Sequence, residues 1–371
     1  MGLRYRPMTA GDIDACVKLI ASRPAQRERY GERLRDLGAA MRRLLELPAK
    51  SAFVFEETGG AGTQLAAVGV SIFANDAFVE ELKSRPFWVG PELTRRILNG
   101  NSPILTEQQV REANSGAGLN CVVWMGRTQP GLETRSDIIR LLANAFIEIH
   151  LGYRWKELIS NQMESAEDVL WVMKTGGMLW DSASQRYQDR LAEDQDPATI
   201  ASRPHVIGLT REIEAQHPGS WIGILLEPRV PRFGFAPSAQ RLLSAALECE
   251  TDGELALRFS ISLSAVKKTW IAAYERVAEC APEVIAPGNL AEKTSGNRGK
   301  EKRRRLLSYL REHPEELRPY ARRNGLPQIE GDGDRILPRL RRNARQPKLQ
   351  PGKTMAKVYE LRATWPNSKR T

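Results

Sequence analysis

Two lysines and two serines near residue 265 have the spacing of a helix that reads nucleic acid. Ser264, Lys267, Lys268 and Ile271 recur at i, i+3, i+4 and i+7, which places them on one face of an α-helix. Ser262 stands just before that helix, where its hydroxyl can accept a backbone N–H as an N-cap. Lysine can donate to guanine O6 and N7 in the major groove, or it can neutralise a phosphate. The pattern therefore predicts a helix that contacts DNA.

The residues around this face predict a helix-turn-helix. Thr251-Asp252-Gly253-Glu254 is a capping box that opens a short helix, and Ser260-Ile261-Ser262 makes a tight turn with Ile261 expected in the core. The third helix is expected to begin at about Leu263, and its inward face is expected to carry Val266, Trp270, Ala273 and Val277. A short helix, a tight turn and a longer helix with small polar and basic outward residues form this layout.

This region, residues 235–280, resembles the LuxR-type helix-turn-helix of transcriptional regulators. The resemblance lies in Leu242-Leu243, Thr251–Ala256, Ile261–Lys268 and Tyr274–Val277. It implies a four-helix DNA-binding module in which Lys267, Lys268 and Ile271 read bases, supported by Ser262 and Ser264. It also implies double-stranded DNA as the ligand and a homodimer on two half-sites. RNA polymerase is the protein partner expected for such a regulator.

Positive charge is concentrated at the C-terminal end. The chain has 371 residues and a net charge of +10, but residues 297–371 hold 21 basic and 8 acidic residues. That segment therefore carries +13, and the preceding 296 residues carry −3. Such asymmetry indicates a polyanionic partner. We expect Arg303, Arg304 and Arg305, on a short basic helix, to contact phosphates beside the module; a solvated helix face is the alternative.

The first 182 residues alternate between strand-like and helix-like segments. Apolar residues from Ile13 onward follow a helical stripe, and Ser136–His150 predicts another helix. Strands are expected at Ser51–Glu56, Leu65–Phe73, Leu119–Met125, Trp155–Asn161 and, after residue 183, Trp221–Leu226. The mixture predicts an α+β chain with a mixed α/β domain in front and an all-α domain behind.

The opening Leu3–Ile13 and the later strand–helix–strand–helix order resemble GNAT-type N-acetyltransferases, which bind acyl-coenzyme A. The resemblance implies cofactor contacts at Arg127 and Gly131, in the loop that such enzymes use for pyrophosphate. Pro130 removes an amide donor from this loop, and Glu133 adds a negative charge. The family's tyrosine acid is also missing near residues 171–174. We therefore expect a non-catalytic sensory or dimerisation domain that requires no cofactor; the alternative is an acyl-coenzyme A-dependent N-acyltransferase with a helical partner-docking module.

Composition excludes several classes of protein. Hydrophobic residues make up 41% and charged residues 27%, which is typical of a globular chain, and no apolar run approaches the roughly 20 residues of a membrane span. The four cysteines have neither metal-ligand nor disulfide spacing, so we expect no metal site and a cytoplasmic location. The expected organisation is a GNAT-like domain (1–182), a connecting region (183–234), the helix-turn-helix (235–280), and a linker, basic helix and basic, partly disordered tail (281–371).

Overall fold

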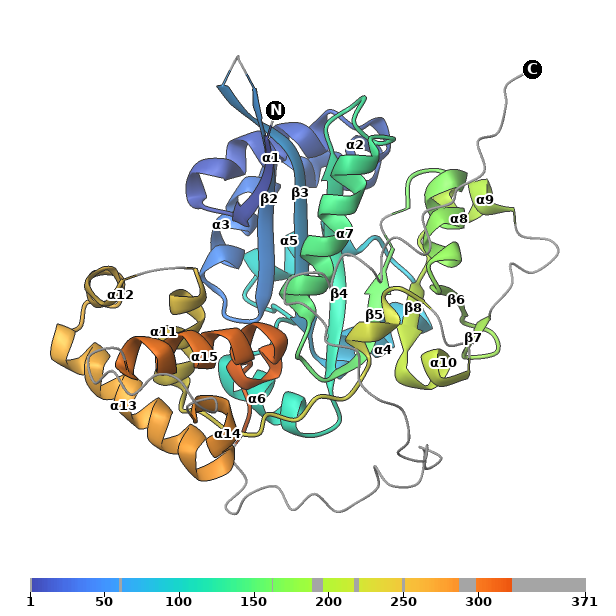
Figure 1. Ribbon diagram of the computed structural model, residues 1–371. Coiled ribbons are helices and arrows are strands. Elements are labelled where there is room, and N and C mark those ends of the chain that lie inside the picture. Colours follow the sequence, from blue (N-terminus) through green and yellow to red (C-terminus); the bar gives the residue numbers. More distant parts are fainter. Residues whose placement is uncertain are drawn as a thin grey trace, which may run out of the picture. The chain divides into compact units, whose positions relative to one another are not determined.

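Eight strands form one mixed sheet in the computed structural model (Figure 1). The structure describes residues 2–59, 62–161, 163–188, 196–216, 220–248, 251–286 and 298–321, without the side chains of 174 and 298–300; the expected basic tail beyond 321 lies outside this range. The strands are β1 (Gly2–Pro7), β2 (Lys50–Gly59), β3 (Gly62–Ala74), β4 (Leu119–Thr128), β5 (Trp155–Ser160), β6 (Met178–Asp181), β7 (Arg186–Gln188) and β8 (Ile207–Thr210). Their order across the sheet is β1-β2-β3-β4-β5-β8-β6-β7.

One pair of neighbouring strands is parallel, and the other pairs are antiparallel. Leu119–Val123 of β4 pair with Trp155–Ser160 of β5 in parallel. β5 ends there, while β4 runs on to Thr128 beside β3. The β3–β4 register shifts between Val70 and Ser71, which makes Trp124 the extra residue of a β-bulge. The bulge changes the direction of β4 at the point where its parallel neighbour stops.

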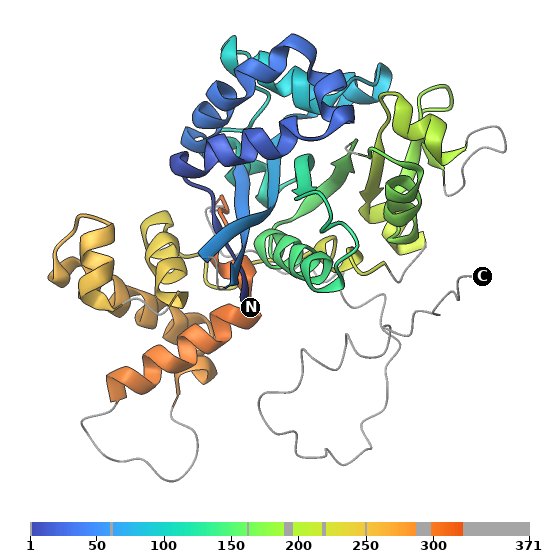
Figure 2. The same cartoon turned by 90° about the horizontal axis from the view of Figure 1, so that it is seen from above.

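Helices cover both faces of the sheet. α1 (Ile13–Ala21), α3 (Leu37–Glu46) and α5 (Val89–Leu98) pack on one face, and α7 (Ser136–His150) packs on the other (Figure 2). Adjacent strand residues divide between these layers: Val54 and Val68 join the first core, whereas Phe55 and Ala67 join the second. This alternation follows from the two-residue period of a strand. The remaining helices of this part are α2 (Pro24–Tyr30), α4 (Asp76–Ser84), α6 (Glu107–Ser115), α8 (Ala166–Lys174), α9 (Pro197–Ser202) and α10 (Arg211–Gln216).

The strands predicted within residues 51–161 and the helix at 136–150 are confirmed, but the strand predicted at Trp221–Leu226 is wrong. Residues Gly223–Leu225 form a 3-10 helix instead, held by i→i+3 bonds such as Leu226 N to Gly223 O. The side chains of Leu225 and Leu226 pack into a core against the sheet, which accounts for the apolar run. The described strands after residue 183 are instead β7 and β8, whose three and four residues are too short to give a periodic signal.

Five α-helices lie beyond residue 236 in the described part of the chain. They are α11 (Pro237–Leu247), α12 (Asp252–Arg258), α13 (Leu263–Cys280), α14 (Pro282–Ile285) and α15 (Arg298–Glu312), followed by a 3-10 turn at Pro314–Leu317. These helices, which we call the helical module, share a core of their own that includes Phe233, Leu243, Leu255, Trp270 and Leu306. The mostly helical C-terminal region is therefore confirmed. No helix in the described ranges is long and apolar enough to cross a membrane.

Candidate nucleic-acid interface

Local sequence signals set the geometry of α12, the turn and α13. The Thr251 hydroxyl accepts the amide of Glu254 at 3.3 Å, while a Glu254 carboxylate oxygen accepts the Thr251 amide at 2.6 Å. This is the predicted capping box. The Ser262 hydroxyl accepts the amide of Ala265 at 3.1 Å, so Ser262 is the N-cap of α13 as expected. Between these caps, Ser260 adopts a φ of 52°, which lets the chain reverse between the two helices.

The inward face of α13 is buried as predicted. Val266, Trp270, Ala273 and Val277 all lie in the module's core. The Trp270 indole N–H donates to Asp252 at 3.2 Å, which ties the third helix to the start of α12. Burial of this stripe fixes which side of α13 faces outward.

The five predicted contact residues lie together on the outward side of α12–turn–α13. Ser262, Ser264, Lys267, Lys268 and Ile271 are all exposed. Lys267 and Lys268 stand in the first two turns of α13, next to the N-terminus. In a helix-turn-helix, the N-terminal residues of the second helix are the ones that meet base edges. The arrangement can therefore present two ammonium groups and two hydroxyl-bearing residues to a groove.

One residue of the turn departs from expectation. Ile261 was predicted to fill the core, but it is 38% exposed. Its backbone explains this, because the Ile261 amide donates to Ala256 O at 3.0 Å and closes the end of α12. The core below the turn is instead filled by Leu255 and Val266.

The three arginines predicted to contact phosphates differ in their surroundings. Arg303 lies 2.6 Å from Asp252 and stacks over the Trp270 ring at 4.5 Å, so it joins α15 to the other two helices. Arg304 and Arg305 each lie 2.8 Å from Glu301, one turn earlier on α15. Arg304 is the most exposed of the three, with 76% of its side chain accessible. Arg303 thus holds the module together, whereas Arg304 is positioned at the surface.

A segment that the sequence did not single out connects the module to the sheet. We call residues 313–321 the strap. On the module side, the Gln240 amide donates to the carbonyls of Glu316 and Arg318, at 3.2 and 2.7 Å. On the sheet side, the Arg318 guanidinium donates to Leu151 O at 2.8 Å, and the Asn114 amide donates to Pro319 O at 2.7 Å. Each of these four bonds has a backbone carbonyl as its acceptor, which sequence periodicity does not reveal.

Two further contacts fix the strap. The buried Glu316 carboxylate accepts the amides of Arg232 and Phe233, at 2.7 and 2.9 Å. Burial raises the pKa of Glu316 to about 7, and neighbouring Glu315 raises it further, while the two amides and His313 oppose the rise. Gly152, with φ of 88°, packs so closely that a Cβ there would lie 2.5 Å from Glu315 N. The close backbone approach requires glycine at this position.

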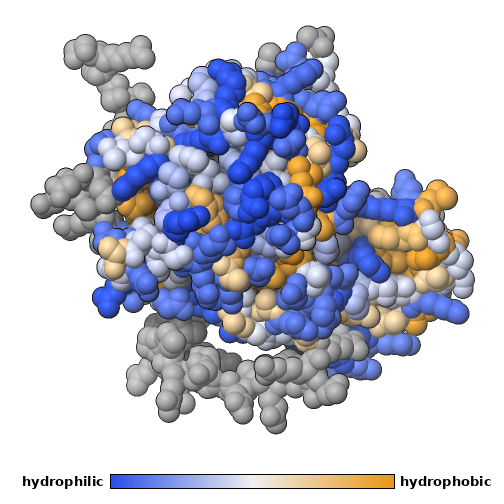
Figure 3. Space-filling model, turned by 180° about the vertical axis from the view of Figure 1, so that it is seen from behind, coloured by the Kyte–Doolittle hydropathy of each residue, from blue (hydrophilic) through white to orange (hydrophobic). Residues whose placement is uncertain are grey.

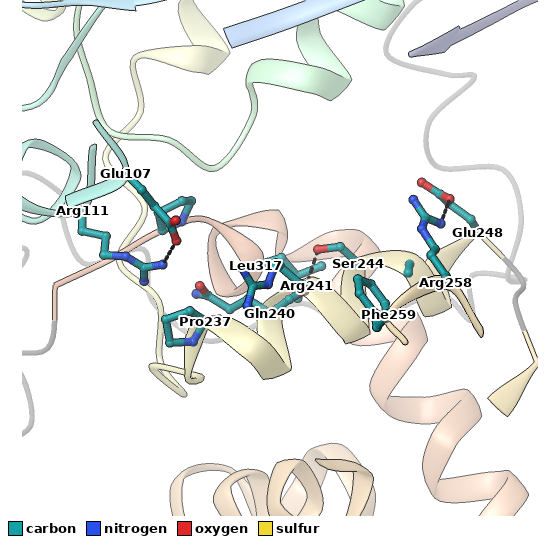
Figure 4. A pocket seen from close by; sticks show the side chains of 12 residues that line it. Glu107, Arg111, Pro237, Gln240, Arg241, Ser244, Glu248, Arg258, Phe259 and Leu317 are labelled. Carbon is teal, nitrogen blue, oxygen red and sulfur yellow. Dashed lines mark hydrogen bonds and ion pairs between the residues drawn. The ribbon is translucent and has the colours of Figure 1, made fainter. Parts of the chain in front are cut away.

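An open pocket of about 270 Å³ lies beside the strap (Figure 4). Two of its arginines are paired, Arg111 with Glu107 and Arg258 with Glu248, as the dashed lines show. The twelve lining residues are Glu107, Arg111, Pro237, Gln240, Arg241, Ser244, Ala245, Glu248, Arg258, Phe259, Leu317 and Pro319. Besides the two ion pairs, the Ser244 hydroxyl donates to the carbonyl of Gln240 within the same wall.

The residues expected to bind a cofactor lie at the end of β4 and in the loop after it. Arg127 is buried, and its Nε atom lies 2.6 Å from Glu164 in the segment after β5. Arg23 and Gln26 from the helical layer also reach Glu164, at 3.7 and 2.6 Å. We call these four residues the Glu164 cluster. Gly131 is exposed in the loop, with φ of 86°. The charge nearest Arg127 is thus supplied by the chain itself.

A buried Ser71–His150 pair resembles part of a catalytic dyad but has a structural role. His150 Nδ1 lies 2.7 Å from Phe146 O, an acceptor, so this nitrogen carries the proton and Nε2 accepts the Ser71 hydroxyl at 2.7 Å. Burial lowers the pKa of His150 to about 4. Both side chains lie within the core, away from solvent. In the described part of the chain, no group of three His, Cys, Asp or Glu side chains could hold a metal ion.

Comparison with known proteins adds no relative. No family model, no curated protein and no solved structure matches the chain. Function must therefore be inferred from the geometry of the helical module and of the Glu164 cluster.

Proposed function

We propose that this chain is a sequence-specific transcription regulator that reads the major groove of double-stranded DNA with α13. One observation carries the proposal: burial of the Val266–Val277 stripe turns Ser264, Lys267, Lys268 and Ile271 outward on one face, next to the exposed N-cap Ser262. The capped turn holds that face at the N-terminal end of a second helix, where helix-turn-helix proteins contact bases. Arg304, at the surface of α15, supplies an additional positive charge for phosphate.

The sheet part has a sensory or dimerisation role in this proposal. Its parallel β4–β5 pair within an otherwise antiparallel sheet supports the resemblance to GNAT-type acetyltransferases. The Glu164 cluster argues against cofactor chemistry, because a carboxylate of the chain already neutralises Arg127. The regulator would act in the cytoplasm as a homodimer, with RNA polymerase as its protein partner and without a required cofactor.

Selection of bound sequences from random duplex DNA tests the proposal, using the full chain. We expect an enriched motif that the Lys267→Ala/Lys268→Ala variant fails to enrich. Lys267→Ala alone should weaken binding to the selected site by about 1–3 kcal/mol and relax one base position. Lys18→Ala/Arg140→Ala, which removes two exposed charges from the sheet part, is the matched control and should keep the motif. The absence of a motif, or a motif unaffected by loss of the α13 lysines, would contradict the proposal.

An acyl-coenzyme A-dependent N-acyltransferase is the second candidate function. The strand order and the parallel β4–β5 pair favour it, with the helical module as a docking unit for a protein partner. Turnover of acetyl-coenzyme A with a panel of amines would support this function. Turnover that persists in Lys267→Ala/Lys268→Ala, together with failure to enrich DNA, would favour the enzyme over the regulator.

A further inference from the structure

Large apolar side chains are exposed on the helix-turn-helix to an unusual degree. Eight such side chains are exposed among the described residues, and four of them lie within the fifteen residues from 257 to 271. These four are Leu257, Ile261, Leu263 and Ile271, at 81%, 38%, 45% and 55% exposure. Figure 3 shows apolar side chains at the surface of the helical module, at the right of that view. Clustered exposed apolar residues mark an interaction surface.

Two of the four flank a proposed DNA-reading lysine. Leu263, Lys267 and Ile271 are spaced at i, i+4 and i+8, so they form one stripe along α13. The stripe runs along one edge of the buried face: Leu263 lies one turn before the buried Val266, and Ile271 lies on the outward side. Leu257 is on α12 and lies off this stripe. The outward surface of α13 therefore alternates apolar, cationic and apolar groups along its axis.

This alternation fits the major groove better than a protein surface. The thymine C5-methyl is the apolar group that the major groove presents, and apolar side chains recognise it by contact. Lysine donates to guanine in the same groove. Protein–protein interfaces, in contrast, are depleted in lysine. A stripe with Lys267 between two apolar side chains, and Lys268 beside it, matches the chemistry of base edges.

We infer that Leu263 and Ile271 contact the methyl groups of two thymines on either side of the base pair read by Lys267. This inference rests on the proposed DNA-binding function. Eight residues of helix span about 12 Å at 1.5 Å per residue. At about 3.4 Å per base pair, the two thymines lie about three to four positions apart along the groove. The half-site should thus carry T·A pairs at two fixed positions around a G·C pair.

Replacement of thymine by deoxyuridine tests the inference, because it removes only the methyl group. In the duplex selected by the full chain, deoxyuridine at each of the two positions should weaken binding by about three- to tenfold. Ile271→Ala should abolish the sensitivity at one position and keep it at the other, and Leu263→Ala should do the reverse. Leu257→Ala, which removes an exposed leucine off the stripe, should keep both sensitivities. All three substituted side chains are exposed, and folding of each variant is checked by its thermal unfolding.

Three other outcomes would overturn the inference, and each leads to a different conclusion about DNA binding. The selected motif could require Lys267 and still tolerate deoxyuridine at every position. In that case the chain binds DNA as proposed, but it does not recognise thymine methyl groups. Sensitivity to deoxyuridine that persists in both alanine variants assigns the methyl contacts to other residues. Failure to select any motif removes the proposed function together with the inference.

Discussion

Arg127 and Glu164 lie 2.6 Å apart, at the place where β5 ends and β4 continues with β3 as its one neighbour. Both side chains are largely buried, so neither charge has bulk water as a partner. Burial lowers the pKa of Arg127, and the negative charge of Glu164 raises it in part. A buried guanidinium of this kind requires a negative charge close by. In this chain the negative charge is an internal carboxylate.

Glu164→Ala should therefore destabilise the protein and create an anion site. Removing one partner of a buried ion pair costs about 3–5 kcal/mol, because the other charge is left uncompensated. Inorganic pyrophosphate should raise the melting temperature of the variant but not that of the wild type. Glu133→Ala is the control, since Glu133 pairs with Arg23 and is 42% exposed; the expected change is below about 1 kcal/mol. If pyrophosphate raised the melting temperatures of the wild type and the variant equally, the Glu164 carboxylate would not be the group that prevents an anion from binding beside Arg127.

Arg303→Ala should reduce stability more than it reduces DNA affinity. Its guanidinium pairs with Asp252 and covers Trp270, so its removal loosens α15 from α12 and α13. We expect a loss of about 1–2 kcal/mol in the free energy of unfolding by denaturant. Arg304→Ala, at an exposed position, should change stability by less than about 0.5 kcal/mol and reduce the salt dependence of DNA binding instead. If Arg304→Ala reduced stability and Arg303→Ala mainly reduced the salt dependence of DNA binding, the structural role assigned to Arg303 would be wrong.

The arrangement of α12, the turn and α13 was predictable because its signals are local. The Thr251 capping box, the Ser262 N-cap and the Val266 stripe each depend on residues within one or two turns, and all three are present in the structure. The strap and the Glu164 cluster were not predictable, because their contacts join residues far apart in the sequence, such as Gln26 with Glu164 and Leu151 with Arg318. Trp221–Leu226 was misread because a buried apolar run has the same pattern in a strand and in a short helix that packs on a core.

His150 should make the protein less stable as the pH falls from about 6.5 to about 4. Its pKa is lowered to about 4 in the folded state, so only the unfolded state binds a proton in that window. His205, also with a pKa of about 4, adds to the effect. The variant His150→Gln should take up one proton fewer on unfolding, measured from the pH dependence of denaturant midpoints. Ser71→Ala is the control, because it removes the hydrogen bond but keeps the titrating ring; it should lower stability and preserve the dependence of stability on pH. An unchanged pH dependence in His150→Gln would contradict the assignment to His150.

Glu316 should produce a slope of the opposite sign. Its pKa is raised from 4.5 to about 7 in the folded state, so the folded protein binds the extra proton between these values. The stabilisation is therefore complete below about pH 4.5, and it is lost as the pH rises through 7. A shift of this size corresponds to about 3 kcal/mol. Glu316→Gln should remove this decline while weakening one of the two bonds to the amides of Arg232 and Phe233.

Glu315→Gln provides the matched control for this prediction. Glu315 is the adjacent strap carboxylate, and it contacts His313 at 3.0 Å and not the two amides. We expect it to retain most of the decline in stability between pH 5 and 8, whereas Glu316→Gln should show little decline. Because the His150 and Glu316 contributions have opposite signs, Glu316→Gln should move the pH of maximum stability upward, and His150→Gln should move it downward. A shift of both variants in the same direction would mean that the strap carboxylate is charged in the folded protein across this range.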